Sequence, residues 1–153
     1  MKNVKGGAGT FFYREIRSDF AEADSLCLEI RSHLAEGGQA AVSFPVELVA
    51  RECIENAILH GNHRDASKKV SLSLHIGRKY IHLQIMDEGK GFNWRKANKA
   101  SLPEVTAVNG RGLAISSLYA ERITYNARGN QIRLRLKKEN EGGLKHGGIH
   151  NRA

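Results

Sequence analysis

The sequence predicts an α+β fold: a two-layer α/β sandwich in which about three helices pack on one face of a mixed, mostly antiparallel sheet. Two long stretches repeat apolar residues at helical spacing, and two pairs of stretches alternate apolar and polar residues. A short turn sequence joins the members of each pair, as in a β-hairpin. With 153 residues the chain is long enough to bury one core. We therefore expect a single folded domain.

The first two helices are expected over residues 19–38 and 43–62. In the second stretch, Ser43 is the expected N-cap, Pro45 falls in the first turn and Gly61 lies near the C-terminus. The first stretch ends at two consecutive glycines, which favour helix termination. Its apolar residues at helical spacing are Phe20, Ala23, Leu26, Cys27, Ile30 and Leu34.

A third helix and about five strands complete the predicted order. One strand is expected over residues 10–18, and hairpins are expected over 69–89 and 122–138. A polar, lid-like segment, 90–109, follows the first hairpin, and the third helix is expected over 110–123. This order of helices and strands predicts that the helices cover one face of the sheet.

The two ends of the chain differ in composition from its middle. Residues 1–9 and 139–153 are rich in glycine and polar residues, so we expect both to be flexible and assign the folded domain to 10–138. The N-terminal segment lacks the continuous apolar core of a secretion signal. No apolar run approaches the ~20 residues that span a bilayer. The sequence therefore predicts a cytoplasmic protein that does not enter a membrane.

The composition narrows the classes of partner. A formal net charge of +8 permits binding to nucleic acid or to an anionic ligand. The lysines and arginines are spread over strands, loops and both ends without a dense basic helix, so direct nucleic-acid binding is not expected. Both cysteines, Cys27 and Cys53, lie inside helical patterns, which indicates reduced core thiols rather than a disulfide.

Polar residues interrupt the apolar pattern of the second predicted helix, in the stretch VARECIENAILHGN. Glu52 and Asn56 are four residues apart and therefore share one helix face. His60 and Asn62 lie near the end of the same helix. Asparagine is a middling helix former whose amide competes for backbone partners, so a helix that only packs has little use for it.

Two glycine motifs follow. The segment MDEGKGF places Asp87 at the end of a predicted strand, before Gly89 and Gly91. The segment NGRGLA places Gly110 and Gly112 at the start of the third helix. Each motif alone is common, because such glycines also serve tight turns and helix entries.

In this order and at these spacings, the motifs resemble the ATP-binding fold shared by gyrase B, the heat-shock-ninety chaperone, sensor histidine kinases and mismatch-repair MutL, the GHKL or Bergerat fold. The resemblance covers about residues 10–138. Three features are most similar to the bacterial anti-sigma factor serine/threonine kinases: the sequence ENAILHGN, the short lid, and the predicted strand followed by a helix at the start of the domain. The resemblance therefore implies a kinase domain that binds ATP and Mg²⁺.

The resemblance implies roles for the two helix residues. The family's asparagine at the position of Asn56 coordinates Mg²⁺ through its side-chain carbonyl, a neutral oxygen that suits a hard ion bridging phosphates. The glutamate at the position of Glu52 is the general base that takes the proton from an attacking hydroxyl. Without the glycine motifs, a solvated Glu52 and a satisfied polar Asn56 would be the simpler interpretation.

The resemblance also implies an adenine-binding residue, Asp87, because a carboxylate at a strand end accepts the exocyclic N–H of the base. Guanine presents an oxygen at that edge, so the contact distinguishes the two purines. Gly89 and Gly91 let the backbone turn and approach the base without a Cβ. The family often supports the aspartate with a Gly-Thr pair. This chain has Gly129 and Asn130 there, so that contact depends on a replacement amide.

Phosphate binding is expected at Gly110, Arg111 and Gly112, because the N–H groups at a helix N-terminus favour anions. The absence of a G-x-x-x-x-G-K-[ST] motif excludes a P-loop. Four further cations either meet the polyphosphate or belong to a solvated loop, and these are Lys90, Arg95, Lys96 and Lys99.

The resemblance implies a homodimeric kinase that sequesters a sigma factor and phosphorylates a serine of a small antagonist protein. Two alternatives stay open. One is an ATP-binding switch that captures a partner with little turnover. The other is a detached catalytic domain of a histidine kinase, which needs a helical hairpin around a phospho-acceptor histidine. The sequence provides no such hairpin around His33.

Overall fold

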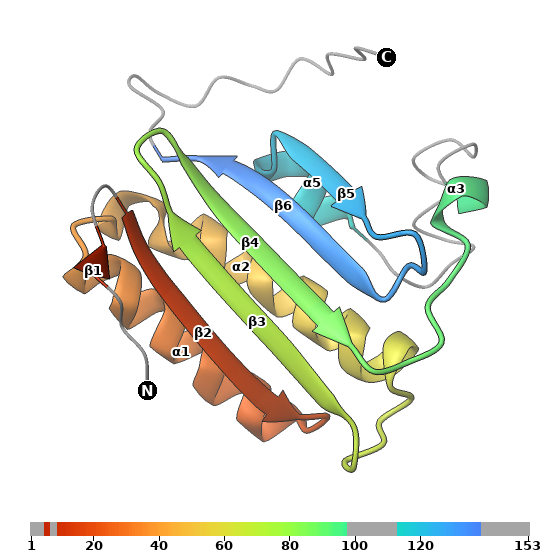
Figure 1. Ribbon diagram of the computed structural model, residues 1–153. Helices are drawn as coiled ribbons and strands as arrows, with labels where there is room; N and C mark the ends of the chain where they lie inside the picture. Colours follow the sequence, from red (N-terminus) through yellow and green to blue (C-terminus); the bar gives the residue numbers. More distant parts are fainter. Residues whose placement is uncertain (1–4, 7–8, 98–112, 139–153) are drawn as a thin grey trace.

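The computed structural model describes residues 5–6, 9–97 and 113–138 of the protein, which form one open sheet with helices against one of its faces (Figure 1). The elements are β1 (Lys5–Gly6), β2 (Gly9–Arg17), α1 (Phe20–Glu36), α2 (Ala40–Asn56), η1 (Ala57–Gly61), β3 (Lys69–Ile76), β4 (Tyr80–Asp87), α3 (Trp94–Ala97), α5 (Ala114–Tyr119), β5 (Arg122–Tyr125) and β6 (Gln131–Lys137).

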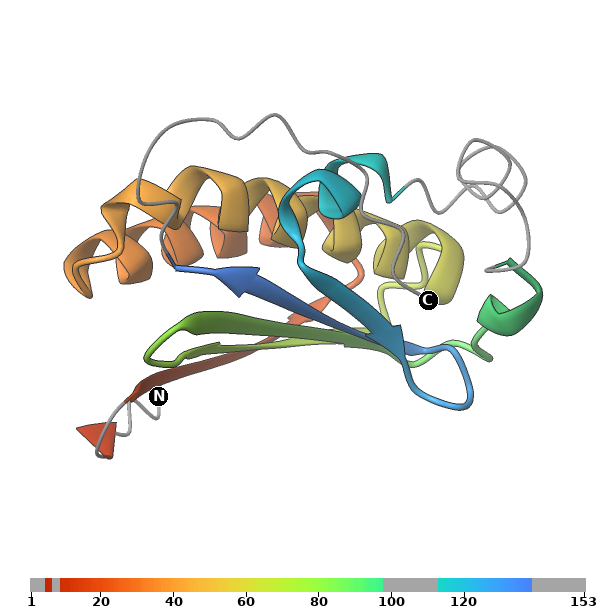
Figure 2. The same ribbon diagram turned by 90° about the horizontal axis from the view of Figure 1, so that it is seen from above.

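The six described strands form one sheet in the order β1-β2-β3-β4-β6-β5, and every described pairing is antiparallel rather than mixed. Figure 2 shows α1, α2 and α5 on the same side of the sheet, which confirms the predicted two-layer α+β sandwich. Both predicted hairpins are present, as β3–β4 and β5–β6. Because β6 pairs with β4, the end of β4 lies beside the start of β6, with Met86 opposite Gln131.

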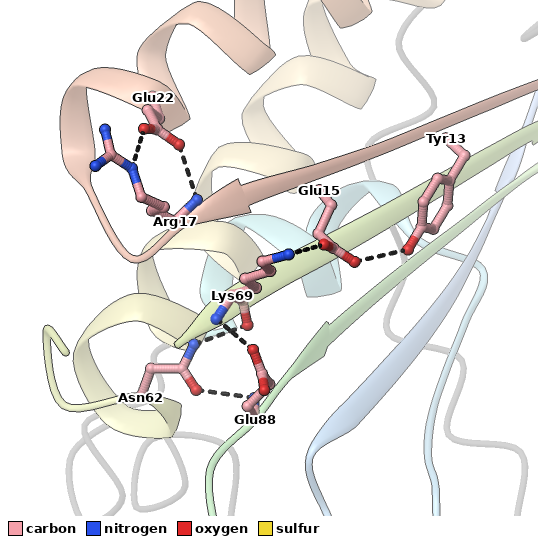
Figure 3. Close-up of polar contacts among 7 residues, drawn as sticks. All are labelled: Tyr13, Glu15, Arg17, Glu22, Asn62, Lys69 and Glu88. Carbon is pink, nitrogen blue, oxygen red and sulfur yellow. Dashed lines mark hydrogen bonds and ion pairs between the residues drawn. The ribbon is translucent and has the colours of Figure 1, made fainter. Parts of the chain in front are cut away.

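Helix α1 begins where the sequence predicts. Asp19 is its N-cap, and the Asp19 carboxylate accepts a hydrogen bond from the Glu22 N–H at 2.9 Å. The Glu22 carboxylate in turn accepts the Arg17 N–H at 2.8 Å (Figure 3). The helix ends at Gly37, and Gly38 adopts a φ of 77° that favours glycine.

Helix α2 begins earlier than predicted, at Ala40, so Ser43 is not its N-cap. The physical reason is the glycine-ended reversal before it: the Gln39 N–H bonds the Leu34 carbonyl at 2.7 Å, and the chain re-enters a helix at once. The Ser43 hydroxyl instead donates to the Ala40 carbonyl at 2.8 Å. Pro45 consequently lies inside the helix.

The end of α2 widens into a π-helical turn, η1, directly after Asn56. Such turns are rare and often accompany functional sites. The buried core lies between α1, α2 and η1 on one side and the inward faces of β2, β3, β4 and β6 on the other. Both cysteines are free and buried within it, as the helical pattern predicts. Burial raises the pKa of Cys27 to about 11 and that of Cys53 to about 12, so neither is a reactive thiolate.

The ends of the chain and of helix α5 differ in part from the prediction. Residues Lys5–Gly6 pair with the start of β2, whereas residues 139–153 lie outside the described part of the chain. Helix α5 ends at Tyr119, shorter than the predicted helix, because Arg122–Tyr125 pairs with β6. None of the helices in the described part of the chain is long and apolar enough to cross a membrane.

Asn62 joins three elements beneath the end of η1. Its side-chain amide donates to the Ser18 hydroxyl at 2.8 Å. The amide also donates to the Lys69 carbonyl at 3.0 Å, and the Asn62 side-chain oxygen accepts the Glu88 N–H at 2.8 Å (Figure 3). The Asn62 side chain is fully buried. It therefore ties η1 to the start of β3 and the end of β4, which is a structural role.

Asn62→Ala is expected to lower the free energy of unfolding by about 1–3 kcal/mol, because it removes one buried and two part-buried hydrogen bonds and leaves the buried Ser18 hydroxyl without its Asn62 donor. Urea unfolding measures this loss. Gln39→Ala is the matched control, since it removes an amide that makes no capping bond at the start of α2. An Asn62→Ala variant as stable as this control would contradict the structural role.

Candidate functional site

A pocket lies between the C-terminal part of α2 and the adjoining ends of β4, β5 and β6. The space between its walls, open mouth included, is about 320 Å³. Apolar residues make up much of the wall, together with an aspartate, two asparagines and a glutamine. The lining residues are Cys53, Asn56, Ala57, Ile85, Asp87, Leu113, Tyr125, Gly129, Asn130, Gln131 and Ile132.

Asp87 is the buried acid of this pocket, at the last position of β4, with 4% of its surface exposed. Its Oδ1 accepts a hydrogen bond from the Gly89 N–H at 2.8 Å. A Cβ at Gly61 would lie 2.3 Å from the Asp87 Cγ, and a Cβ at Gly89 would lie 2.0 Å from the Gly61 carbonyl oxygen. The carboxylate therefore has room only because both neighbouring positions are glycine.

Asn130 holds the backbone of Asp87 rather than its carboxylate. The Asn130 amide donates to the Asp87 carbonyl oxygen at 3.0 Å, and the Asp87 N–H donates to the Asn130 carbonyl at 2.9 Å. The amide at this position thus supports the acid through the main chain, at the point where β4 and β6 meet.

Gly91 lies where the segment after β4 meets the turn between β5 and β6. Its φ is 79°, and a Cβ there would lie 1.9 Å from the Arg128 carbonyl oxygen. Gly129 has a φ of 80°, and its Cβ would lie 2.2 Å from the Phe92 carbonyl oxygen. These two glycines let the segment after β4 lie against the β5–β6 turn, which closes one side of the pocket.

Asn56 lies on the wall formed by α2, immediately before the π-helical turn. Its Nδ2 is buried and has no hydrogen-bond partner among the residues that the structure describes. An orphaned buried amide costs about 1–3 kcal/mol, so its retention calls for an explanation. The side chain is placed to bind a ligand in the pocket.

Glu52 lies one turn before Asn56 on α2 and is half-buried. Its Oε2 accepts hydrogen bonds from the Ser116 N–H at 2.9 Å and from the Ser116 hydroxyl at 3.2 Å. Burial raises the pKa of the Glu52 carboxyl, and the bonds from Ser116 oppose that rise. The carboxylate is thus held near the pocket by the first turn of α5, with a higher proton affinity than an ordinary glutamate.

Gly110, Arg111 and Gly112, together with Lys99, lie outside the described residues. Arg95 packs over the Trp94 ring, 4.5 Å from its centroid, at the start of α3.

Sequence reasoning missed several residues that organise the site. Ser116 bonds Glu52, Gly61 makes room for Asp87, and Tyr125 lines the pocket. Asn126 shapes the β5–β6 turn, because its side-chain oxygen accepts the N–H groups of residues 129, 130 and 131. Of these residues, only Asn126 could have been predicted from the sequence. An asparagine shortly before a glycine often forms a turn in which its side chain accepts backbone hydrogen bonds.

The sequence profile of the histidine kinase-like ATPase domain matches residues 16–136 of this chain. This match spans most of the chain and includes every described residue of the pocket, so the protein belongs to the histidine kinase-like ATPase domain family. A search of curated proteins finds no significant relative. Membership of this family indicates ATP binding and an activity of the ATPase or kinase type.

The residue types that line the pocket suit a purine base. Apolar side chains such as Ile85 and Ile132 suit the faces of a base, and the Asp87 carboxylate suits an exocyclic amine. The unpartnered Asn56 amide belongs to the pocket wall, whereas Glu52, one helical turn before it on α2, is not among the lining residues.

Proposed function

We propose that this protein is an ATP-dependent protein serine/threonine kinase that acts in the cytoplasm as an anti-sigma factor. It phosphorylates a serine of a small antagonist protein and, as a homodimer, sequesters a sigma factor. One observation carries the kinase part: Glu52 and Asn56 lie one turn apart on α2, with Asn56 in the wall of the pocket that contains Asp87. The partners follow from the resemblance of the motifs.

Each residue contributes one function to this proposal. Asp87 accepts the exocyclic N–H of adenine, and the backbone of residues 110–112 binds phosphate. The Asn56 carbonyl oxygen ligates Mg²⁺, which neutralises charge on the transferred phosphoryl group. Glu52 accepts the proton of the serine hydroxyl while the serine oxygen forms a bond to the γ-phosphorus of ATP. The bond between the γ-phosphorus and the bridging oxygen breaks, and ADP leaves. Such a transfer depends mainly on positioning and electrostatics.

The raised pKa of Glu52 supports a role as a base. Burial is its first cause, and a carboxylate destabilised by burial binds a proton more tightly than a solvated one. A general base is most effective when its pKa approaches the working pH. Because Glu52 is half-buried, it is not simply a solvated helix residue. The same burial favours its role in proton transfer.

Asn56→Ala is expected to weaken the Mg²⁺-dependent part of ATP affinity by about tenfold, because one metal ligand is lost. Calorimetric titration with ATP, in Mg²⁺ and again in EDTA, separates the two contributions. The EDTA affinity is expected to change little. An equal loss under both conditions would show that Asn56 acts on the nucleotide itself and not through the metal.

A second candidate function is an ATP-binding switch with little turnover. The favouring observation is that Glu52 already accepts two hydrogen bonds from Ser116. A substrate hydroxyl must replace or join these bonds before Glu52 can take its proton. If α5 stays in place when ATP is bound, the protein binds nucleotide and partner without transfer.

The deciding experiment is a transfer assay with a candidate small antagonist protein, chosen from the genes adjacent to that of this protein, and with its serine-to-alanine variant. Both are incubated with Mg-ATP and the protein, and intact masses are measured. The kinase proposal predicts a gain of one phosphoryl group on the antagonist and none on the alanine variant. ATP binding by calorimetry without any mass gain would instead support the switch.

A further inference from the structure

The face of the sheet that points away from the helices carries a row of basic side chains across four strands. Arg122 on β5 is opposite Arg135 on β6, Arg135 is opposite His82 on β4, and His82 is opposite His75 on β3. Strands lie about 4.8 Å apart, so the row extends over about 14 Å. Arg133 lies on the same face of β6, two residues before Arg135.

Four cationic side chains continue this row at one end of the sheet. Arg78 and Lys79 form the β3–β4 turn, and Lys137 and Lys138 lie at the end of β6. The Lys138 N–H donates to the Lys79 carbonyl at 3.1 Å, which brings the two segments together. We call these four residues, with the row and Arg133, the basic patch.

The charges of the basic patch are poorly compensated, in contrast to cations elsewhere. On the helical side, Arg14 pairs with Glu29 at 2.8 Å. At the far end of the open face, Lys69 pairs with Glu15 at 2.7 Å (Figure 3). Within the described part of the patch, the ion pair is that of Arg135 with Glu121, at 3.2 Å.

Arg122 and Arg133 have no carboxylate partner among the described residues; Arg133 donates instead to the Gln84 side-chain oxygen at 3.0 Å. Like charges on directly opposed strand positions, as at Arg122 and Arg135, destabilise a sheet. An anionic partner would remove this repulsion.

The centre of the basic patch is a shallow hollow of about 830 Å³, its open side included. Three neutral side chains that can donate or accept hydrogen bonds lie in it beside the cations: Ser73, Gln84 and Thr124. Guanidinium groups bind carboxylates through two parallel hydrogen bonds, and neutral donors add directional contacts. The hollow thus offers fixed donors as well as charge.

We propose that the basic patch binds an acidic segment of a protein partner, with aspartate or glutamate carboxylates seated against Arg122 and Arg133. A nucleic acid suits it less well. The Tyr80 ring is covered by the Arg135 guanidinium at 4.6 Å and approached by the Lys79 amine at 5.5 Å, so a base would compete with these cations for stacking on that ring. A second copy presenting the same face would meet it with like charge.

This proposal does not rest on the proposed kinase activity. The basic patch lies on the opposite face of the sheet from the pocket, since Ile85 and Ile132 point inward while His82 and Arg133 point outward. A protein that failed to phosphorylate anything could still bind an acidic segment there, and the reverse also holds.

The test uses fluorescence anisotropy with a short fluorescein-labelled oligoglutamate peptide, an oligoglutamine peptide and a single-stranded DNA of equal charge to the oligoglutamate. Removing two unpaired cations with Arg122→Gln and Arg133→Gln is expected to weaken oligoglutamate binding about tenfold. The control pair, Arg64→Gln and Lys68→Gln, changes net charge equally in the loop before β3 and is expected to change affinity less than about twofold.

The outcomes separate the occupants. Tighter binding to oligoglutamate than to the DNA, together with loss only in the Arg122 and Arg133 variant, supports an acidic protein segment. Equal loss in both charge pairs would show a non-specific effect of net charge and overturn the proposal. Tighter binding to the DNA than to oligoglutamate, lost only in the Arg122 and Arg133 variant, would assign the basic patch to nucleic acid and overturn the proposal. Self-association of the protein that the same two substitutions abolish would assign the patch to a second copy and would also overturn it.

Discussion

Glu52→Gln is expected to lower phosphoryl transfer to a serine by about 10²–10⁴-fold while ATP affinity changes less than about twofold. Glutamine has nearly the same shape as glutamate, and its side-chain oxygen can still accept the Ser116 bonds that hold Glu52 in place. It cannot take a proton from an attacking hydroxyl. The variant therefore removes the proposed base and leaves the pocket around Asp87 unchanged.

The assay for Glu52→Gln is the mass gain on the antagonist serine, with ATP affinity measured separately by calorimetry. Glu55→Gln is the matched control, because Glu55 lies on the same helix and is not the residue that accepts the Ser116 hydrogen bonds. It is expected to transfer phosphoryl groups at nearly the original rate. A Glu52→Gln variant with normal transfer would remove Glu52 from the role of base.

The pH dependence of transfer gives a second measure of the same role. Because burial raises the pKa of Glu52, its carboxyl stays protonated to a higher pH than an ordinary glutamate. Transfer is therefore expected to rise with pH through that raised pKa and to be weakest in acid. Ser116 donates two bonds that favour the charged form, so the position of α5 sets where this rise occurs.

The strands were the part of the fold most readily predicted from the sequence. Alternation in KVSLSLHI and YIHLQIMD predicts one buried and one exposed face, and the structure has that pattern in β3 and β4. The order of strands was harder, because local patterns do not say which hairpins are neighbours. The pairing of β4 with β6, which brings Asp87 to Asn130, follows from packing between distant segments.

Helix boundaries depended on interactions that a local pattern does not contain. Ser43 has the residue type of an N-cap, but the reversal at Gly38 starts α2 before it. The π-helical turn η1 has no signature in the spacing of apolar residues. Asn62 shows the same limit. A polar residue after a helix can line a pocket, cap the helix or form buried hydrogen bonds between elements, and only the three hydrogen-bond partners of Asn62 show which role it has.

The candidate site was predictable in its residue types and less so in its contacts. Asp87 and Asn56 are both in the pocket wall, as the motif spacing predicts. Gly61, however, looked like a helix end, and its close approach to the Asp87 carboxylate appears only when η1 packs on β4. Ser116 is separated from Glu52 by 64 residues, and no local rule joins them.

Asp87→Asn is expected to weaken ATP binding by about ten- to a hundredfold, the largest effect on nucleotide affinity that we predict. The loss corresponds to about 1.5–3 kcal/mol, as for a hydrogen bond to a charged group. An asparagine has one side-chain oxygen. If it accepts the Gly89 N–H, as Asp87 does at 2.8 Å, its NH₂ group faces the exocyclic amine of adenine, and two donors oppose each other.

The same reasoning predicts a change in base preference, which separates base reading from a general loss of structure. An amide NH₂ suits the exocyclic oxygen of guanine, so Asp87→Asn should narrow the ratio of ATP to GTP affinity. Calorimetric titration with each nucleotide measures this, and thermal unfolding verifies the fold. Asp65→Asn is the control, because Asp65 lies in an exposed loop. Equal losses for ATP and GTP in a folded Asp87→Asn protein would mean that Asp87 supports the pocket without reading the base.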